Sequence, residues 1–380
     1  MKKIALLTLN GYFNYGNRLQ NYALQEILNL MNFKVETVIN NNKPSKNKNY
    51  TFKERMNNIM NMTFRKMFII LKYKIWLKKN QNEIEKREKN RRKTFKVFTL
   101  NYIKETDYSI SDNNIPENLS DRYDYFIAGS DQVWNPNYNL GSSIYFLTFA
   151  DKHKRIAYAP SFGVSEIKPE FIENYKDWIF GMHKLSVRED DGAKIIKELT
   201  GRDAPVLVDP TLLLTKEKWL AIAKEADNKP KGRYLLTYFL GGIPDNYKKQ
   251  IKSIVKENRL EVINLGNIRE KETYRTGPSE FIDYINDCSV FCTDSFHGAV
   301  FSILLEKPFI VFERIGSGSM YSRIETLLNK FNLNSRKAEN ISWEEDVFKI
   351  DFSHVPEILE FERNKSLDYL KYALNIEGAN

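Results

Sequence analysis

The chain has 380 residues, of which 42% are apolar and 13% aromatic, and its formal net charge at neutral pH is +9. This length and apolar content are enough to bury two ordinary hydrophobic cores, which excludes a largely disordered chain. The N-terminal apolar run is too short for a signal peptide, and no later run reaches the roughly 18 apolar residues of a membrane span. We therefore expect a cytoplasmic protein, either free or peripheral on the inner face of the cell membrane.

Positive charge is concentrated in residues 43–96, which contain 18 Lys and Arg against 4 Glu. Subtracting this local balance of +14 from +9 leaves about −5 for the rest of the chain. Apolar residues between Met56 and Ile75 recur mostly every three or four positions, which predicts one long or two shorter amphipathic helices. The segment suits docking onto an anionic membrane, and equally suits packing on its own domain. RNA binding is a weaker alternative, because no RNA-binding module accompanies the charge.

Short apolar or β-branched runs alternate with helical patterns in the first half of the chain. Strands are predicted at 4–9, 34–39, 125–128, 155–159, 185–188 and 206–208, and helices at 18–31 and 192–199. Because these strands are apolar throughout and do not alternate, they predict a parallel sheet that is covered on both faces.

The same alternation resumes after Pro210. Helices are predicted at 216–226, 246–258 and 279–286, after His297, and at 320–331, and strands at 234–240, 261–265, 290–293 and 309–312. The two series predict an α/β protein with two Rossmann-like domains facing a cleft. We expect an N-terminal domain at 1–215 that carries the basic helical insertion, a C-terminal domain at 216–345 and a helical tail at 346–380.

Cys288 and Cys292 are separated by three residues and have no neighbouring His cluster. This pattern suits neither a disulfide framework nor a zinc site, so buried free thiols are expected. No other cluster of His, Asp and Glu in the sequence demands a metal.

Open α/β sheets bind ligands beyond the carboxyl ends of their strands, and the first such turn is residues 10–17. Its glycines allow backbone amides to approach an anion at the start of the next helix, and Arg18 adds positive charge. Asn14 and Asn17 belong to the same turn. The alternative is an ordinary turn, because Gly and Asn are common turn residues.

The second turn, residues 129–136, holds more polar side chains than a turn requires. Asp131 is placed to accept a proton from a sugar hydroxyl or to hold that hydroxyl, with Gln132, Trp134 and Asn135 beside it. The alternative is a helix-capping Asp with Trp134 in the core.

Turn 159–163 is explained almost entirely by structure, whereas turn 186–190 ends a predicted apolar strand with Arg188. Its guanidinium group offers a planar fork to a carboxylate or phosphate. The alternative is an ion pair with Glu189 or Asp190, although neighbouring residues of a strand point to opposite faces.

Turn 294–298 is the strongest candidate for catalysis. His297 follows a predicted strand and begins a helix, so its ring is expected to project into the cleft, where imidazole can act as an acid or a base. The alternative is a packed core histidine. Further on, small residues and hydroxyls at 316–319, flanked by Arg314 and Arg323, predict a phosphate-binding nest at a helix start.

Five motifs follow one another along the chain: NYGNRLQNYAL from residue 14, GSDQVWNP from 129, SVRE from 186, LVDPTLL from 207 and DSFHG from 294. Together they resemble the polysaccharide pyruvyl transferase family from residue 4 to about 332, the basic segment excepted. The resemblance implies a fold similar to GT-B glycosyltransferases, with the acceptor on the first domain and the donor on the second. It also implies transfer of a pyruvyl group from phosphoenolpyruvate to two hydroxyls of a sugar. The product would be a ketal on a lipid-linked or polymeric glycan of a capsule, exopolysaccharide or cell wall.

The resemblance further implies acid chemistry at the donor for His297, and a role as base or acceptor ligand for Asp131. The donor-binding residues are then Arg188, Ser295, Phe296, Arg314, Ser317, Gly318, Ser319 and Arg323, and the acceptor-binding residues are Asn14, Asn17, Arg18, Gln132, Trp134 and Asn135. Phosphoenolpyruvate is a co-substrate, so no cofactor is expected, and no nucleic acid is expected as a partner.

One position departs from the family pattern. Ser295 stands where members tend to have an Arg, two residues before the motif His. An anion partner is lost there, so either Arg314 or Arg323 holds the donor, or the donor is not phosphoenolpyruvate. Two alternatives stay open: a GT-B glycosyltransferase that binds a nucleotide sugar through residues 316–319, and a non-catalytic, membrane-associated glycan assembly factor.

Overall fold

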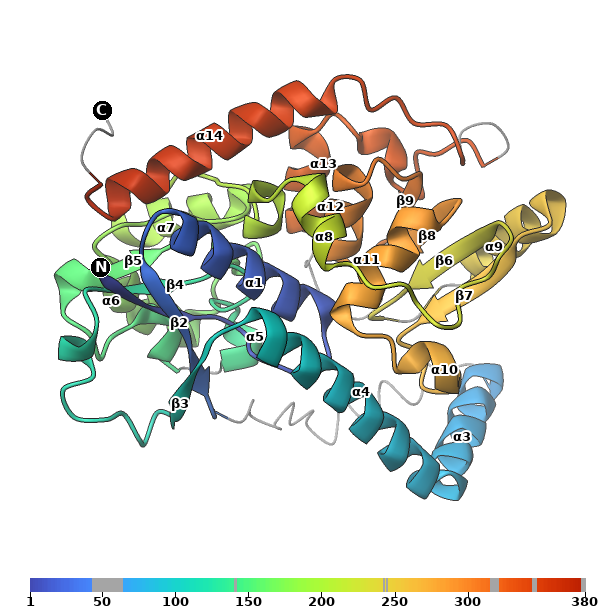
Figure 1. Ribbon diagram of the computed structural model, residues 1–380, viewed down its shortest axis with the longest axis horizontal. Helices are drawn as coiled ribbons and strands as arrows, with labels where there is room; N and C mark the ends of the chain where they lie inside the picture. The colour runs from blue at the N-terminus through green and yellow to red at the C-terminus, as the bar shows by residue number, and fades with distance from the viewer. Residues whose placement is uncertain are drawn as a thin grey trace.

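The computed structural model describes residues 1–42, 64–139, 142–241, 243, 245–314, 321–343 and 347–376. Within these residues, each half of the chain forms a parallel β-sheet packed with helices (Figure 1). The predicted α/β fold with two Rossmann-like domains is therefore confirmed. The domain limits 1–215, 216–345 and 346–380 remain a prediction.

The first sheet has five strands in the order β3-β2-β1-β4-β5. Its strands are β1 (Lys3–Leu7), β2 (Lys34–Asn40), β3 (Glu105–Ile110), β4 (Tyr125–Ala128) and β5 (Arg155–Ala157), and its main helices are α1 (Tyr15–Leu30), α6 (Ile172–Phe180) and α7 (Asp190–Thr200). All neighbouring strands are parallel, and Leu7 at the end of β1 pairs with Ala128 at the end of β4. The loops that follow these strands therefore gather at one edge of the sheet.

The second sheet has four parallel strands in the order β7-β6-β8-β9. Its strands are β6 (Tyr234–Tyr238), β7 (Glu261–Leu265), β8 (Val290–Thr293) and β9 (Phe309–Val311), and its helices are α8 (Lys216–Ile222), α9 (Asp245–Asn258), α10 (Lys271–Tyr274), α11 (Pro278–Asp287), α12 (Phe296–Leu304) and α13 (Ser322–Lys330). The predicted strands and helices of this half are found within a few residues of their expected positions, except that α8 ends four residues early. The fully apolar pattern of β8 and β9 fits their burial.

In the first half two predicted strands were wrong and one strand was missed. Residues 185–188 and 206–208 do not form strands and meet instead through a single bridge between Val187 and Val206. Strand β3 was missed because its sequence ETDYSI is largely polar, as suits the edge strand that it forms.

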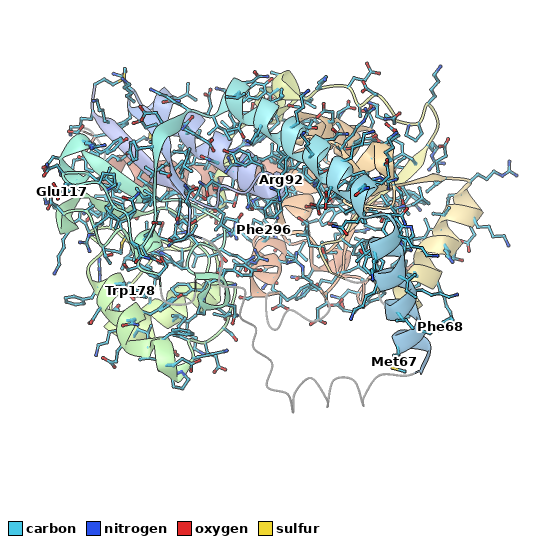
Figure 2. The ribbon with its side chains drawn as sticks, turned by 90° about the horizontal axis from the view of Figure 1, so that it is seen from below. Met67, Phe68, Arg92, Glu117, Trp178 and Phe296 are labelled. Carbon is cyan, nitrogen blue, oxygen red and sulfur yellow. The ribbon has the colours of Figure 1, made fainter. Side chains whose placement is uncertain are left out.

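The basic insertion divides into two helices with different surroundings. Helix α4 (Gln81–Tyr102) packs on the protein through Phe95 and Phe98, whereas the end of α3 (Phe64–Lys79) that carries Met67 and Phe68 projects from the body (Figure 2). The packing interpretation is therefore confirmed for α4. The part of the predicted amphipathic segment from 43 to 63 lies outside the described residues.

An aromatic cluster joins the two domains beneath the cleft. The ring of Tyr15, in the first turn of α1, stacks on Phe281 of α11 with 4.2 Å between centroids and meets Tyr238 of β6 at 5.1 Å. Arg91 of α4 donates hydrogen bonds to the Tyr15 hydroxyl at 3.1 Å and to the Tyr274 carbonyl at 2.7 Å. Aromatic packing and a buried cation thus fix the first turn of α1 against the second domain.

The expected C-terminal helix is α14 (Val355–Ala373), and it crosses back over both domains (Figure 1). Arg363 donates to the carbonyls of Leu212 and Leu214, and Tyr369 donates to the carbonyl of Ala157. On the other side, Glu362 pairs with Lys330 of α13 at 2.8 Å. The helix therefore ties the two domains together.

The two cysteines are free and buried, as predicted. Burial raises the pKa of the Cys288 thiol to about 12, so it stays protonated and unreactive near neutral pH. Across the described part of the chain, no helix combines the length and the apolar character needed to cross a bilayer.

Candidate active site

A cavity of about 700 Å³ opens between the two domains, beyond the carboxyl ends of β1, β2, β4 and β8. Residues of the first domain line one wall: Leu9, Asn10, Gly11, Phe13, Asn14, Asn17, Asn40, Asn42, Asp112, Asp131, Gln132, Tyr138, Ser142 and Tyr145. Residues of the second domain line the other: Leu240, Ser295, Phe296, His297, Arg314 and Arg323. Phe296 lies near the centre of the molecule in this view (Figure 2). Nine of the predicted site residues therefore meet in one cavity.

His297 is held in the first turn of α12 at the floor of this cavity. Ser295 caps the helix by accepting a hydrogen bond from the Gly298 amide at 3.3 Å, which fixes the turn that carries the imidazole. The ring occupies the space that a side chain at Gly16 would fill, because a Cβ there would lie 2.1 Å from His297 Nδ1. The glycine of the first domain thus makes room for the histidine of the second.

Asp209 faces the other nitrogen of this ring. Its Oδ2 lies 3.4 Å from His297 Nε2 and accepts hydrogen bonds from Arg188 Nη1 at 2.7 Å and Ser130 Oγ at 2.8 Å. Thr211 donates to the second carboxylate oxygen through its amide and its hydroxyl. Burial alone raises the pKa of Asp209, but His297, Arg188 and Thr211 outweigh it, so the pKa lies well below its ordinary value. The carboxylate is therefore ionised and able to orient the imidazole.

Asp209 is a site residue that the sequence analysis missed. The motif LVDPTLL contains it, but nothing in that sequence indicates which distant side chains surround it. Only the packing of α12 against residues 207–213 brings Asp209 to His297.

Arg188 lies beneath the cavity floor and does not line it. It is 3% exposed, donates to Asp209, lies 3.8 Å from Asp131 Oδ1 and stacks 4.4 Å from the Phe296 ring centroid. Arg188 is therefore not placed to make the predicted contact with the donor. Instead it holds Asp209, Asp131 and Phe296 in position at the cavity floor. The alternative prediction paired Arg188 with Glu189 or Asp190. Arg188 does form an ion pair, but with Asp209, while Glu189 accepts three hydrogen bonds from residues 161–163.

Two arginines of the second domain line the cavity. Arg314 is anchored by donating to the Asp294 carbonyl at 3.0 Å, and the Asp294 carboxylate in turn accepts from the amides of Leu240 and Gly241. Burial, together with the positive charges of Arg188 and Arg314, lowers the pKa of Arg323 to about 10. The guanidinium of Arg323 therefore stays charged near neutral pH, and the cluster of Arg188, Arg314 and Arg323 gains stability from a bound anion.

Asp131 reaches the cavity from a constrained backbone. Its φ of +77° lies in the left-handed region that side chains rarely adopt, and its carbonyl accepts from the amides of Val133 and Ser161. Its Oδ1 accepts from the Gln132 amide at 2.8 Å. Such strain at a cavity wall is typical of a site where position matters more than local stability.

The first-domain wall carries mostly uncharged polar groups. Asn42 and Ser142 both donate to the carboxylate of Asp112, at 2.8 and 2.7 Å, and Asn40 lies at the end of β2. Amides and hydroxyls in such a row suit the donors and acceptors of sugar hydroxyls. The sequence analysis missed these residues, and for Asp112 the reason is that strand β3, which precedes it, was not predicted.

Three predicted acceptor residues do not line the cavity. Arg18 is fully buried and donates to Glu105 at 2.9 Å and to the Leu9 carbonyl at 3.1 Å. Trp134 is also fully buried and donates to the Tyr145 carbonyl, which confirms the alternative that placed it in the core. Asn135 donates to Gln132 Oε1 at 2.8 Å and so orients a residue that does line the cavity.

Asn14 and Asn17 line the cavity at the start of α1, where Asn14 Oδ1 accepts from the Asn17 amide at 3.4 Å. The predicted phosphate nest at Ser317, Gly318 and Ser319 lies outside the described residues and stays a prediction. In the part of the chain that the structure describes, no group of three or more His, Cys, Asp or Glu side chains is arranged to hold a metal ion.

The model of one protein family, described as polysaccharide pyruvyl transferase, matches residues 14–315. The chain belongs to this family. Membership makes the protein a transferase and implies transfer of a pyruvyl group onto polysaccharide. No curated protein matches the sequence significantly.

Solved structures share the architecture at low sequence identity. A putative UDP-N-acetylglucosamine 2-epimerase from Listeria monocytogenes is 9% identical, with a TM-score of 0.50 over 100% of this chain and 98% of that chain. S. aureus MnaA with UDP is 11% identical, with a TM-score of 0.48 over 99% of this chain and 98% of that chain. E. coli ADP-heptose LPS heptosyltransferase II is 10% identical, with a TM-score of 0.36 over 96% and 99% of the two chains. With its two parallel-sheet domains, the chain shares the GT-B-like fold of the Listeria monocytogenes structure, as expected.

Proposed function

We propose that this pyruvyl transferase moves the pyruvyl group of phosphoenolpyruvate onto two hydroxyls of one sugar, forming a pyruvate ketal. The acceptor is a cell-surface glycan, of a capsule or exopolysaccharide, or its lipid-linked precursor. One observation carries the proposal: a single cavity has the cationic side chains of Arg314 and Arg323 on one wall, with His297 at the floor, and amides, hydroxyls and the carboxylates of Asp112 and Asp131 on the other. An anionic donor and a hydroxyl-rich acceptor fit these two walls.

The donor is assigned to the second domain. Phosphoenolpyruvate carries a phosphate and a carboxylate, and Arg314 and Arg323 offer two guanidinium groups to them. These two arginines can bind the anion in place of the arginine that the family pattern has at position 295, where this chain has Ser295. The nest at 316–319 is expected to add amide hydrogen bonds to the phosphate.

The reaction needs one acid and one base. In the first step His297 donates a proton to the methylene carbon of the donor, while the first sugar hydroxyl adds to the neighbouring carbon and gives its proton to Asp131. Loss of phosphate and addition of the second hydroxyl then close the ketal, and the proton of that hydroxyl leaves with the phosphate. The sequence of steps is redox-neutral and requires no cofactor.

The test is to incubate purified protein with phosphoenolpyruvate and lipid-linked glycans, and to follow phosphate release and glycan mass. Equal amounts of phosphate and ketal-linked pyruvate are expected. Glycosyl transfer from a nucleotide sugar instead would show that the fold serves a glycosyltransferase. Binding of glycan without either reaction would favour a non-catalytic assembly factor.

We also propose that the protein works at the inner face of the cell membrane, because a lipid-linked acceptor is confined there. Such a location requires a surface that attaches the protein to lipid, and α3 is the candidate.

A further inference from the structure

Helix α3 exposes apolar side chains among the residues whose side chains are described. Phe68 is 57% exposed, Leu71 53%, Ile75 47% and Met67 45%. Figure 2 shows Met67 and Phe68 at the outer end of a helix that projects from the body of the protein. Soluble proteins rarely expose such a contiguous apolar surface without a partner for it.

The charge of α3 is of one sign. Its sequence FRKMFIILKYKIWLKK contains six basic residues and no acidic residue. Lys72 lies 4.5 Å from the Phe68 ring centroid, so cationic and apolar groups alternate on the same exposed surface. This combination complements a partner that is both anionic and able to accept apolar side chains.

The basic residues of α4 differ from those of α3, because several of them bind groups of the protein itself. Arg91 is buried and donates to the carbonyls of Phe13 and Tyr274, and Arg87 donates to the carbonyls of Ile268 and Arg269. These contacts account for α4 as a packed helix. Among the described side chains of α3, Tyr73 and Trp76 pack on the body, where Arg269 lies 5.0 and 5.1 Å from their ring centroids.

We propose that α3 binds the surface of an anionic lipid bilayer, with Met67, Phe68 and Leu71 entering the headgroup region. Its lysines then contact lipid phosphates from above. A second copy of the chain is a poorer partner, because two helices with six positive charges each repel one another. RNA or an acidic polymer would satisfy the lysines but leave the aliphatic side chains in water. The binding does not depend on the proposed reaction.

The experiment is co-sedimentation of the full-length protein with vesicles of phosphatidylglycerol and phosphatidylcholine, or of phosphatidylcholine alone. Binding is expected only to the anionic vesicles, and it should weaken as salt screens the charges. Two triple variants separate the apolar and charged contributions: Phe68→Ser with Leu71→Ser and Ile75→Ser, and Lys72→Glu with Lys74→Glu and Lys78→Glu. Each should reduce partitioning at least about tenfold.

The matched control is Lys86→Glu with Lys89→Glu and Lys93→Glu, which reverses the same number of charges on the exposed face of α4. This variant should bind much more tightly than the α3 charge variant. An unchanged thermal unfolding midpoint in all three variants shows that they are folded, and this readout does not depend on the proposed reaction. Undiminished vesicle binding of both α3 variants would overturn the proposal. The proposal would also be overturned if the wild-type protein did not bind vesicles but formed a dimer, and if the α3 apolar variant abolished that dimer.

Discussion

Gly16 and His297 come from opposite domains, and their contact decides where the imidazole stands. A hydrogen atom is the whole side chain at Gly16, and the ring of His297 fills the place of a Cβ. Position 16 therefore requires glycine because of the His297 ring, and not because of the conformation of the helical turn in which it lies.

We predict that Gly16→Ala and His297→Ala each lower turnover by at least about 10²-fold, the usual size of a general acid contribution. The first variant displaces the ring and the second removes it. Steady-state phosphate release measures both. Gly232→Ala is the control, because a Cβ at Gly232 meets nothing within 4 Å, and it should retain normal turnover. Normal turnover of His297→Ala would refute the role of His297 as acid.

We predict that Asp209→Asn lowers the free energy of unfolding at pH 7 by about 3–5 kcal/mol, because it leaves Arg188 buried without its charge partner. The pKa of Asp209 is depressed in the fold, so its contribution is complete above the unfolded-state pKa and is lost as the pH falls. The difference from wild type should therefore shrink only below about pH 4. Denaturant unfolding at several pH values measures it.

The control is Asp203→Asn, whose side chain is 88% exposed and pairs with Lys197 at the surface. It should change the free energy of unfolding by no more than about 1 kcal/mol. An equal effect of the two substitutions would show that burial of the Asp209 pair does not matter.

At the scale of elements, the basic insertion contributes one packed helix and one projecting helix. Helix α4 is locked by Arg91, whose guanidinium lies 4.8 Å from the Tyr15 ring centroid and 5.0 Å from that of Tyr274. Through Tyr15 it supports the first turn of α1, and so the contact of Gly16 with His297. A positive charge in this helix is thus a packing residue of the active site.

We predict that Arg91→Ala lowers the free energy of unfolding by about 2–3 kcal/mol, because it leaves the part-buried carbonyls of Phe13 and Tyr274 without a donor and removes the guanidinium packed on the Tyr15 ring. Its exposed neighbour provides the comparison, and Arg92→Ala should stay within about 0.5 kcal/mol of wild type. Chemical denaturation of both variants measures the difference. Similar midpoints would show that α4 is a surface helix.

At the scale of the molecule, the two domains share one hydrophobic cluster. It runs from Ile4 in β1 through Phe281 in α11 to Leu327 in α13 and Leu370 in α14. Helices α4 and α14 both contact the two domains and so join them.

We predict a single cooperative unfolding transition in calorimetry, with equal calorimetric and van't Hoff enthalpies, because neither domain can lose its half of this cluster alone. Adding phosphoenolpyruvate should raise the transition temperature through binding to the folded state. Two separate transitions would contradict the shared core.

The sequence by itself predicted the order of nearly all strands and helices, because continuous apolar runs and helical periodicity are local properties. It also identified the turns that meet in the cavity, since parallel strands place their carboxyl ends at one edge. His297, Asp131, Arg314 and Arg323 were found in this way. Edge strand β3 escaped because half-exposed strands lose the apolar signal.

Only the tertiary structure decided which charges line the cavity and which are buried in the fold. Arg18, Arg188 and Arg91 resemble Arg314 and Arg323 in the sequence, yet only Arg314 and Arg323 of these five line the cavity, whereas the first three bind carboxylates or carbonyls away from it. An arginine's partner depends on segments far along the chain that pack against it, as Asp209 shows for both Arg188 and His297. Local patterns therefore determined the framework of this transferase, and long-range packing determined its active site.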